Sequence, residues 1–221
     1  MYNNKLQIYN YCFCYRYGLN IKTLNDSQVA YTYRSYVYTG QPAIIDDNPL
    51  YLQTTLAKTC KLMEEYGWDK LSGNSLTTDN YYSSLDLVDV CSEHNIGFCG
   101  TLRHNRRGVH NDFIKTEGRA ENSTIVWHDQ SRANVTLSSY CVSTKSKGKK
   151  CVLLLASIPD LPTMGVTKDD NHRKTALFKY YDFSMMGTDV CGKYNYLFEA
   201  NFVQFFMAAN FSYIFFIRKQ L

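Results

Sequence analysis

The order in which strand-forming and helix-forming segments follow one another constrains the fold of this chain more than any other feature. Side chains at residues 29–38 alternate between two faces, and a polar turn at 25–28 joins them to a preceding strand-like segment, which indicates an antiparallel hairpin. The expected elements are, in order, strands at 18–25 and 29–38, a helix from Asn48 to about Gly67, a strand at 73–77, a helix at 83–94 and a strand at 96–102. This alternation predicts a mixed α/β protein.

The second half of the chain has a weaker pattern. Its strand-like segments are all short and lie at 124–127, 134–138 and 152–156. A turn rich in Lys, Ser and Gly at residues 144–150 separates the last two. We expect residues 108–176 to form a β-rich insertion in the main domain and not a domain of their own. From residue 177 to the end we expect helices, interrupted near Gly192.

Length and composition fit one folded domain. The 221 residues are 45% hydrophobic and include 19 tyrosines, which is enough apolar surface for one core with a small insertion. The eight cysteines contain no Cys-x-x-Cys pair, and the first 20 residues lack the apolar stretch of a signal peptide. We therefore expect reduced thiols that are mostly buried. The apolar segment at 197–217 contains Glu199, Asn201 and Gln204, so we expect a buried or amphipathic helix and no membrane contact.

Two short basic clusters stand out from a net charge of only +4. Residues 103–107 read Arg-His-Asn-Arg-Arg, and residues 145–150 contain four lysines. Clustered basic side chains suit contact with nucleic-acid phosphates, but they also occur in solvated loops without a ligand, and the residues alone leave both interpretations open. The candidate DNA-contacting residues are Arg103, Arg106, Arg107, Lys147, Lys149 and Lys150.

Three aspartates are candidates for metal-dependent chemistry. Cleavage of a phosphodiester bond with two metal ions needs carboxylates that converge from the ends of rigid elements. Asp26 follows the first strand, Asp79 follows the strand at 73–77, and Asp189 lies in the expected C-terminal helical region. If the strands before Asp26 and Asp79 are neighbours, the two carboxylates meet at one edge of the sheet. Each position alone also fits ordinary turn chemistry.

Longer sequence blocks point to a family. Residues 76–85 read Leu-Thr-Thr-Asp-Asn-Tyr-Tyr-Ser-Ser-Leu, and residues 99–108 read Cys-Gly-Thr-Leu-Arg-His-Asn-Arg-Arg-Gly. Together they resemble the two central blocks of piggyBac transposases, in the same order and with a matching gap. Further resemblances, also in family order, cover residues 18–27, 37–40, 181–189 and 209–214.

The resemblance implies an RNase H-like fold with a β-rich insertion before the last catalytic helix. By this similarity Asp26, Asp79 and Asp189 are the three catalytic aspartates, and they bind two Mg²⁺ or Mn²⁺ ions. The family excises DNA at transposon ends and inserts it at TTAA targets, so the implied partner is DNA and the implied location is the nucleus. A second copy or another transposase-derived chain is a candidate partner, and no small-molecule substrate is implied.

The sequence also departs from the family pattern. Gly192 stands where the family has a fourth acidic residue, and Met186 and Thr188 replace the Gly and Val before the last aspartate. The resemblance assigns the whole chain to the catalytic domain, with its core at about 15–107 and 177–221. It leaves out the family's N-terminal DNA-binding and dimerisation region and its Cys-rich zinc-binding tail, so we expect that this chain alone does not transpose. A nuclease core, a non-catalytic DNA- or protein-binding module and a decayed transposon fragment remain as alternatives.

Two residues near the motif blocks have expected structural roles. We expect Asn80 to orient the loop that carries Asp79. We expect Trp127 to be buried in the core, although an exposed indole at this position would suit stacking on a nucleobase. Four histidines have no Cys or His partners at metal-ligand spacing, so we assign no role to His94, His104, His110 and His172.

Overall fold

The computed structural model describes residues 20–27, 31–38, 54–106, 108–132, 134–144, 148–158, 174–186 and 210–219. Within these ranges eight strands form one mixed sheet, in the order β2-β1-β8-β3-β4-β7-β6-β5. The strands are β1 (Asn20–Asp26), β2 (Thr32–Tyr38), β3 (Asn74–Thr78), β4 (Gly97–Leu102), β5 (Thr124–His128), β6 (Thr136–Thr144), β7 (Gly148–Ala156) and β8 (Asn210–Lys219). The helices are α2 (Thr55–Tyr66), α3 (Trp68–Leu71), α4 (Leu85–Glu93), the 3₁₀ turn η1 (Asn111–Phe113) and a helix at 176–186.

The N-terminal hairpin and the helix after it follow the sequence prediction with shifted ends. β1 and β2 pair antiparallel, and a bulge interrupts their register between Leu24 and Asn25. Helix α2 begins after Thr54, whose side-chain oxygen accepts a hydrogen bond from the Ala57 N–H at 3.1 Å. The helix ends at Gly67, where a φ of 109° requires a residue without a side chain. The expected start of this helix at Asn48 lies outside the described residues.

The unit formed by β3, α4 and β4 confirms the predicted strand–helix–strand alternation. β3 and β4 pair parallel, as a helical crossover between them requires. Ser84 caps α4, since its Oγ accepts from the Leu87 N–H at 3.2 Å. The helix then buries Leu87, Val88 and Cys91 against the sheet.

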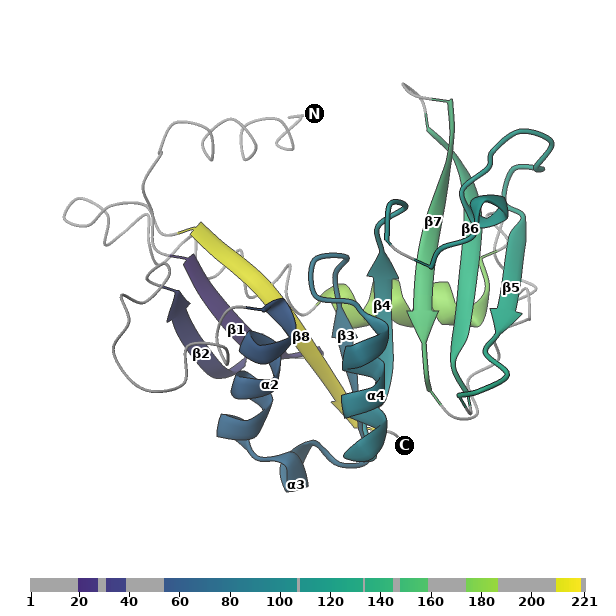
Figure 1. Cartoon of the computed structure of the whole chain (residues 1–221). Helices are drawn as coiled ribbons and strands as arrows, with labels where there is room; N and C mark the ends of the chain where they lie inside the picture. The colour runs from purple at the N-terminus through teal and green to yellow at the C-terminus, as the bar shows by residue number, and fades with distance from the viewer. Residues whose placement is uncertain are drawn as a thin grey trace, which may run out of the picture.

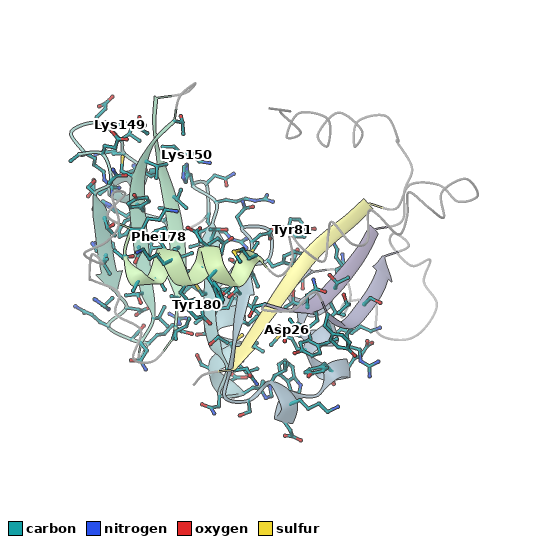
Figure 2. The ribbon with its side chains drawn as sticks, turned by 180° about the vertical axis from the view of Figure 1, so that it is seen from behind. Asp26, Tyr81, Lys149, Lys150, Phe178 and Tyr180 are labelled. Carbon is teal, nitrogen blue, oxygen red and sulfur yellow. The ribbon has the colours of Figure 1, made fainter. Side chains whose placement is uncertain are left out.

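Two apolar clusters lie on opposite faces of this sheet. On one face, α2 and α4 pack through Leu62, Met63, Leu87 and Val88 against buried residues of β1, β3 and β4. On the other face the helix at 176–186 packs through Leu177 and Phe178 against Tyr140 and Leu154. Figure 1 shows α2 and α4 in front of the sheet, and Figure 2 shows the helix at 176–186 crossing the opposite face. The described molecule is therefore a three-layer α/β structure.

The strands of the expected insertion extend the same sheet. β7 pairs antiparallel with β4, β6 pairs with β7 as a hairpin, and β5 lies at the edge. β6 and β7 both have nine residues and are longer than the strand-like segments that the sequence suggested. The five described cysteines are free thiols, four of them buried, as expected.

The C-terminal segment differs from the prediction. We expected helix to the end of the chain, but residues 210–219 form β8, which pairs parallel with β1 and antiparallel with β3. Residues 210–217 read Asn-Phe-Ser-Tyr-Ile-Phe-Phe-Ile. Aromatic and β-branched side chains favour strands, and a nearly continuous apolar run is typical of a strand with neighbours on both sides. No helix among the described residues is long and apolar enough to cross a membrane.

Candidate active site

The loop after β3 carries Asp79 in a defined geometry. The Asp79 Oδ1 accepts a hydrogen bond from the Tyr81 N–H at 2.9 Å. The Asp79 carbonyl accepts from both the backbone N–H and the hydroxyl of Ser83, at 3.2 and 2.8 Å. One turn therefore carries the chain from the end of β3 to the cap of α4.

A glycine of the second motif block packs against this loop. The hydroxyls of Thr78 and Ser83 form a buried hydrogen bond of 2.8 Å. Gly100 on β4 lies directly beside them: a Cβ at this position would meet the Ser83 Oγ at 2.2 Å and the Thr78 Oγ1 at 2.6 Å. Only glycine gives the loop this space, so the glycine of the second block and the serine of the first depend on each other.

Two arginines of the second block donate hydrogen bonds to the loop. The Arg103 Nε donates to the Asn80 side-chain oxygen at 3.0 Å, and its guanidinium lies 5.6 Å from the centre of the Tyr81 ring. Arg106 donates to the Ser83 carbonyl at 2.7 Å. Asn80 is thus linked to Arg103, and its expected role in orienting the loop stays a prediction. Both arginines are exposed, and a guanidinium has five N–H donors, so most of their donor capacity faces outward.

Positive charge gathers around the Asp79 carboxylate. Lys22 on β1 is almost fully buried, at 4% exposure, and its ammonium lies 5.3 and 5.5 Å from the ring centres of Tyr81 and Tyr82. Burial raises the pKa of Asp79, while the Tyr81 and Tyr82 N–H groups, Arg103 and Lys22 oppose that shift. Burial also lowers the pKa of Lys22, with Lys58 acting in the same direction and Asp79 against it.

Asp26 lies elsewhere in the sheet. It is the last residue of β1, and its Oδ2 accepts a hydrogen bond from the Tyr33 hydroxyl at 2.5 Å. Burial raises the pKa of Tyr33, and this bond adds to the shift. Tyr33 in turn packs against Tyr66 near the end of α2, with ring centres 4.9 Å apart. Asp26 is thus part of a contact between β1, β2 and α2.

The strand order separates Asp26 from Asp79, which corrects the expectation that β1 and β3 are neighbours. β8 lies between them, parallel to β1 and antiparallel to β3, so β1 and β3 run in opposite directions. Asp26 is level with Ile217, which pairs with Leu76, three residues before Asp79. At two strand spacings across and three residues along, the Cα atoms are roughly 14 Å apart.

The described residues do not by themselves form a metal site. They contain no group of three His, Cys, Asp or Glu side chains close enough to hold one ion. Asp189 and Gly192 lie outside the described residues. Transposases generally use divalent metal ions, and the Asp79 carboxylate is the one predicted ligand that the described structure places in the loop built by the two motif blocks.

The second basic cluster lies far along the sheet. Lys149 and Lys150 are exposed at the start of β7, and Figure 2 shows them at the outer end of the β6–β7 hairpin, away from Tyr81. Lys149 donates to the Arg119 carbonyl at 2.6 Å. Arg107 and Lys147 lie outside the described residues. The structure therefore places Arg103 and Arg106 at the Asp79 loop and leaves the lysines at a separate position.

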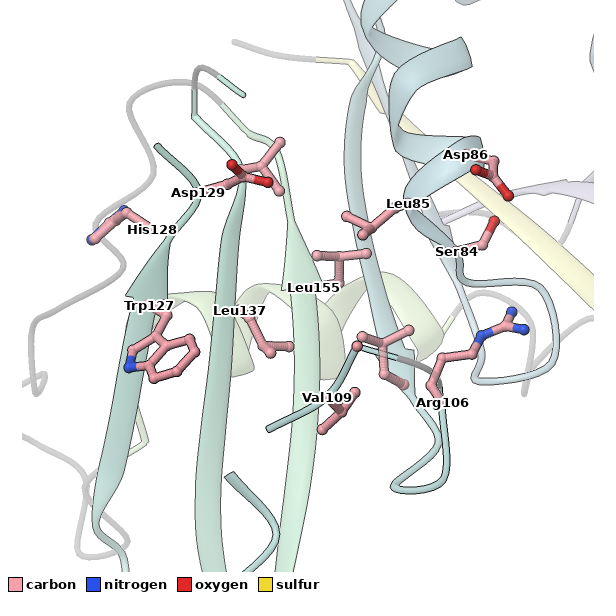
Figure 3. Close-up of a pocket in the computed structure, with 13 residues that line it drawn as sticks. Ser84, Leu85, Asp86, Arg106, Val109, Trp127, His128, Asp129, Leu137 and Leu155 are labelled. Carbon is pink, nitrogen blue, oxygen red and sulfur yellow. The ribbon is translucent and has the colours of Figure 1, made fainter. Parts of the chain in front are cut away.

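Two pockets adjoin the Asp79 loop. A polar pocket of about 330 Å³ lies between the start of α2 and the loop, where Thr54, Asn80, Tyr81, Arg103 and Arg106 line it. A larger one, of about 620 Å³, lies between the start of α4 and the strands β5–β7. Figure 3 shows Leu137, Leu155 and Trp127 on one side of it and Leu85 and Arg106 on the other.

Trp127 corrects a prediction. We expected it in the core, but it is 51% exposed, and it contacts Phe113 edge to face with ring centres 4.8 Å apart. Trp127 belongs to β5, the edge strand of the sheet, so no described strand flanks it on the outer side. The indole lines the larger pocket instead.

The sheet and its helices place the protein in the α/β class. Its likeness to a solved structure identifies the fold as RNase H-like. The structure is similar to that of piggyBac transposase, solved by cryo-EM as a synaptic complex with hairpin DNA, with a TM-score of 0.56 and 20% sequence identity. The match covers 83% of this chain and 33% of that chain, so the sequence spans a third of that protein. No curated protein matches the sequence.

The family is shown by its sequence model. The model of the family described as Transposase IS4 matches residues 2–211, nearly the whole chain. The chain belongs to this transposase family.

Sequence reasoning missed Lys22, Gly100 and the cap at Thr54 as parts of this site. Lys22 carried no motif, since one lysine in an apolar strand signals nothing by itself. Gly100 was visible within the second block, and a glycine inside a strand pattern does mark a close approach of another chain segment. That signal was available, but the approaching partner, Ser83, could only be found from the structure.

Proposed function

We propose that this chain is the catalytic core of a cut-and-paste DNA transposase that cleaves DNA and transfers strands at TTAA targets in the nucleus. The family match and the likeness of fold support a transposase core. The observation that carries the proposal is the Asp79 loop. There the first motif block supplies a half-buried carboxylate, and two exposed arginines of the second block are hydrogen-bonded to the same loop. The piggyBac transposase structure is a complex with hairpin DNA, which supports DNA as the partner proposed for this chain.

The charges around Asp79 suit a DNA phosphate. Lys22 and Arg103 are close enough to Asp79 to shift its pKa. Arg103 and Arg106 both line the smaller, polar pocket beside the loop. Phosphate oxygens approaching this pocket meet guanidinium N–H donors in a fixed orientation, because Asn80 and the Ser83 carbonyl already hold the two arginines. In this proposal the two exposed arginines bind and orient the DNA backbone, the buried Lys22 contributes its charge only at a distance, and Asp79 faces the bond to be cut.

The metal ligands are part of the proposal. Asp26, Asp79 and Asp189 are proposed to hold two Mg²⁺ or Mn²⁺ ions, which when bound would activate the attacking oxygen and stabilise the leaving one. The described geometry supports Asp79 as a metal ligand and does not bring Asp26 close to Asp79. We therefore assign no reaction step to the ions.

Metal binding tests this proposal without DNA. Calorimetric titration of the chain with Mn²⁺ should show binding that Asp79→Asn removes. Asn keeps a side-chain oxygen that can accept the Tyr81 N–H bond, so the loop stays in place and only the charge is lost. Asp69→Asn, an exposed aspartate at the start of α3, is the matched control and should bind as wild type does. No heat of binding at millimolar Mn²⁺ would exclude the catalytic proposal.

The exposed Trp127 favours a second candidate function, a DNA-binding module without catalysis. An indole stacks on unpaired bases, and Arg106 lines the same pocket at a position that suits a neighbouring phosphate. Under this alternative, single-stranded DNA quenches tryptophan fluorescence in wild type and much less in Trp127→Phe, while Asp79→Asn binds and quenches like wild type. Trp68, the other tryptophan, is stacked on His94 with ring centres 3.9 Å apart. Its fluorescence supplies a background that DNA does not change.

A further inference from the structure

The β6–β7 hairpin contains two cysteines in direct cross-strand register. Cys141 on β6 pairs with Cys151 on β7, so their side chains leave the sheet on the same face. Both are free thiols and both are buried, at 0% and 1% exposure. No other described cysteine has a cysteine opposite it in the sheet, since Cys99, the one other described cysteine in a strand, faces Ala156.

The backbone hydrogen bonds show which kind of pair this is. The N–H of Cys141 donates to the Ser123 carbonyl at 2.9 Å, and its carbonyl accepts from the Asn122 N–H at 2.8 Å. Both groups therefore point away from β7. On the other strand the Cys151 carbonyl contacts the His104 Nε2 at 2.6 Å, which is on the side away from β6. The two cysteines thus form a non-hydrogen-bonded pair.

This register brings the two thiols within bonding reach. In non-hydrogen-bonded antiparallel pairs the Cα atoms lie about 4.5 Å apart. Disulfides span Cα separations of about 4.4–6.8 Å, so a bond between Cys141 and Cys151 needs little movement of the backbone. The same reasoning excludes Cys99, whose partners in the neighbouring strands are Ala156 and Thr77.

A cation lies against the pair. The Arg119 Nη1 donates to the Cys151 Sγ at 3.4 Å, and the same sulfur donates to the Lys115 carbonyl at 3.5 Å. Arg119 is fixed there by bonds to Ser139, at 2.7 Å to the hydroxyl and 2.8 Å to the carbonyl. Arg119 therefore places a positive charge directly against the Cys151 sulfur.

We propose that Cys141 and Cys151 are an oxidation site that forms an intrachain disulfide with a small peroxide as oxidant. The Cys151 thiolate attacks one oxygen of hydrogen peroxide, so an S–O bond forms, the O–O bond breaks and hydroxide leaves to become water. The Cys141 sulfur then attacks the sulfenic acid, the S–O bond breaks and a second water leaves with the Cys141 proton. Two thiols and one peroxide give one disulfide and two waters. The product joins β6 to β7 next to the hairpin end that carries Lys149 and Lys150.

The test is peptide mapping of the whole chain after treatment with hydrogen peroxide. Remaining thiols are alkylated in acid before digestion, which prevents exchange. We expect alkylation of Cys141 and Cys151 to be lost together, with one linked pair of peptides that joins Cys141 to Cys151. The link should be absent in Cys141→Ala and in Cys151→Ala, and present in Cys99→Ala, a buried cysteine of the same sheet.

An internal reference sets the dose of oxidant. Peroxide is raised until the methionines of wild type begin to form sulfoxide. If Cys141 and Cys151 are then both still alkylated, if they carry sulfinic acid without a link, or if either is linked to another cysteine, the proposal is wrong. This readout comes from the unmodified sequence, so it does not depend on whether a variant folds or on whether the chain cleaves DNA.

Discussion

Replacing Gly100 by alanine is the sharpest structural test of the Asp79 loop. The added Cβ would lie 2.2 Å from the Ser83 Oγ, 2.6 Å from the Thr78 Oγ1 and 2.9 Å from the Phe98 Cζ. All three separations are below normal contact. Because Ser83 also bonds to the Asp79 carbonyl, its displacement disturbs the turn that positions Asp79.

The expected cost follows from two terms. Forcing one extra methyl group into a packed site costs about 1–3 kcal/mol. Breaking the buried hydrogen bond between Thr78 and Ser83 adds about 1 kcal/mol. We therefore expect Gly100→Ala to lower the free energy of unfolding by about 3 kcal/mol, which for a chain of this size lowers Tm by roughly 6–12 °C.

Thermal and urea unfolding, followed by circular dichroism, measure this cost. The double variant Ser83→Ala/Gly100→Ala removes the closest clash, so its loss should be smaller than the sum of the single losses by about 1 kcal/mol or more. Gly118→Ala is the control, because Gly118 has a φ of +72° and nothing within 4 Å of its Cβ position. Its cost of about 1–2 kcal/mol for the left-handed backbone should be unaffected by Ser83→Ala. A Gly100→Ala chain as stable as wild type would refute the interlocked loop.

Three further predictions concern charge. Arg103→Ala should weaken DNA binding and reduce the slope of log affinity against log salt by about 1, whereas Lys115→Ala should leave the slope unchanged; equal slopes would exclude a phosphate contact at Arg103. Because burial raises the pKa of Asp79, the folded chain holds this proton at higher pH than the unfolded chain does, so stability falls as pH rises above 3.8. Asp79→Asn should lack this part of the fall in urea unfolding at stepped pH, and identical profiles would contradict it. Hydrogen bonds from Ser131 and Arg132 lower the pKa of Asp129 to about 2, so its stabilising contribution is present above 3.8 and is lost as pH falls toward 2. Asp129→Asn should therefore lose less stability in acid than wild type, and an equal loss would count against these bonds.

Local chemistry made much of the first half of the fold predictable from sequence. The strand–helix–strand unit around α4 was found because the apolar positions of its helix repeat with helical period. The hairpin of β1 and β2 was found because its second strand alternates. These signals lie within a few residues of one another.

Features that depend on distant segments could not be predicted in the same way. The apolar segment at 210–217 is compatible with a buried helix or a central strand, and the choice depends on whether the edges of β1 and β3 are free to pair. Trp127 was expected in the core, but it lies on the edge strand β5 and is half exposed. The same difference between local signals and contacts of distant segments applies to the site. Asp79, Arg103 and Arg106 were found in motif blocks, whereas Lys22 reaches the loop from a strand 57 positions earlier in the sequence.

Cleavage of DNA by the purified chain tests the central claim most directly. The substrate is a labelled duplex with a TTAA junction, incubated with Mn²⁺ and compared among wild type, Asp79→Asn and Asp69→Asn. We expect nicks with free 3′-hydroxyl ends in wild type and in Asp69→Asn, and a rate lower by roughly 100-fold or more in Asp79→Asn, with DNA binding retained. Equal nicking by Asp79→Asn, or no nicking by a wild-type chain that binds the duplex, would contradict the assignment of this loop as the active centre.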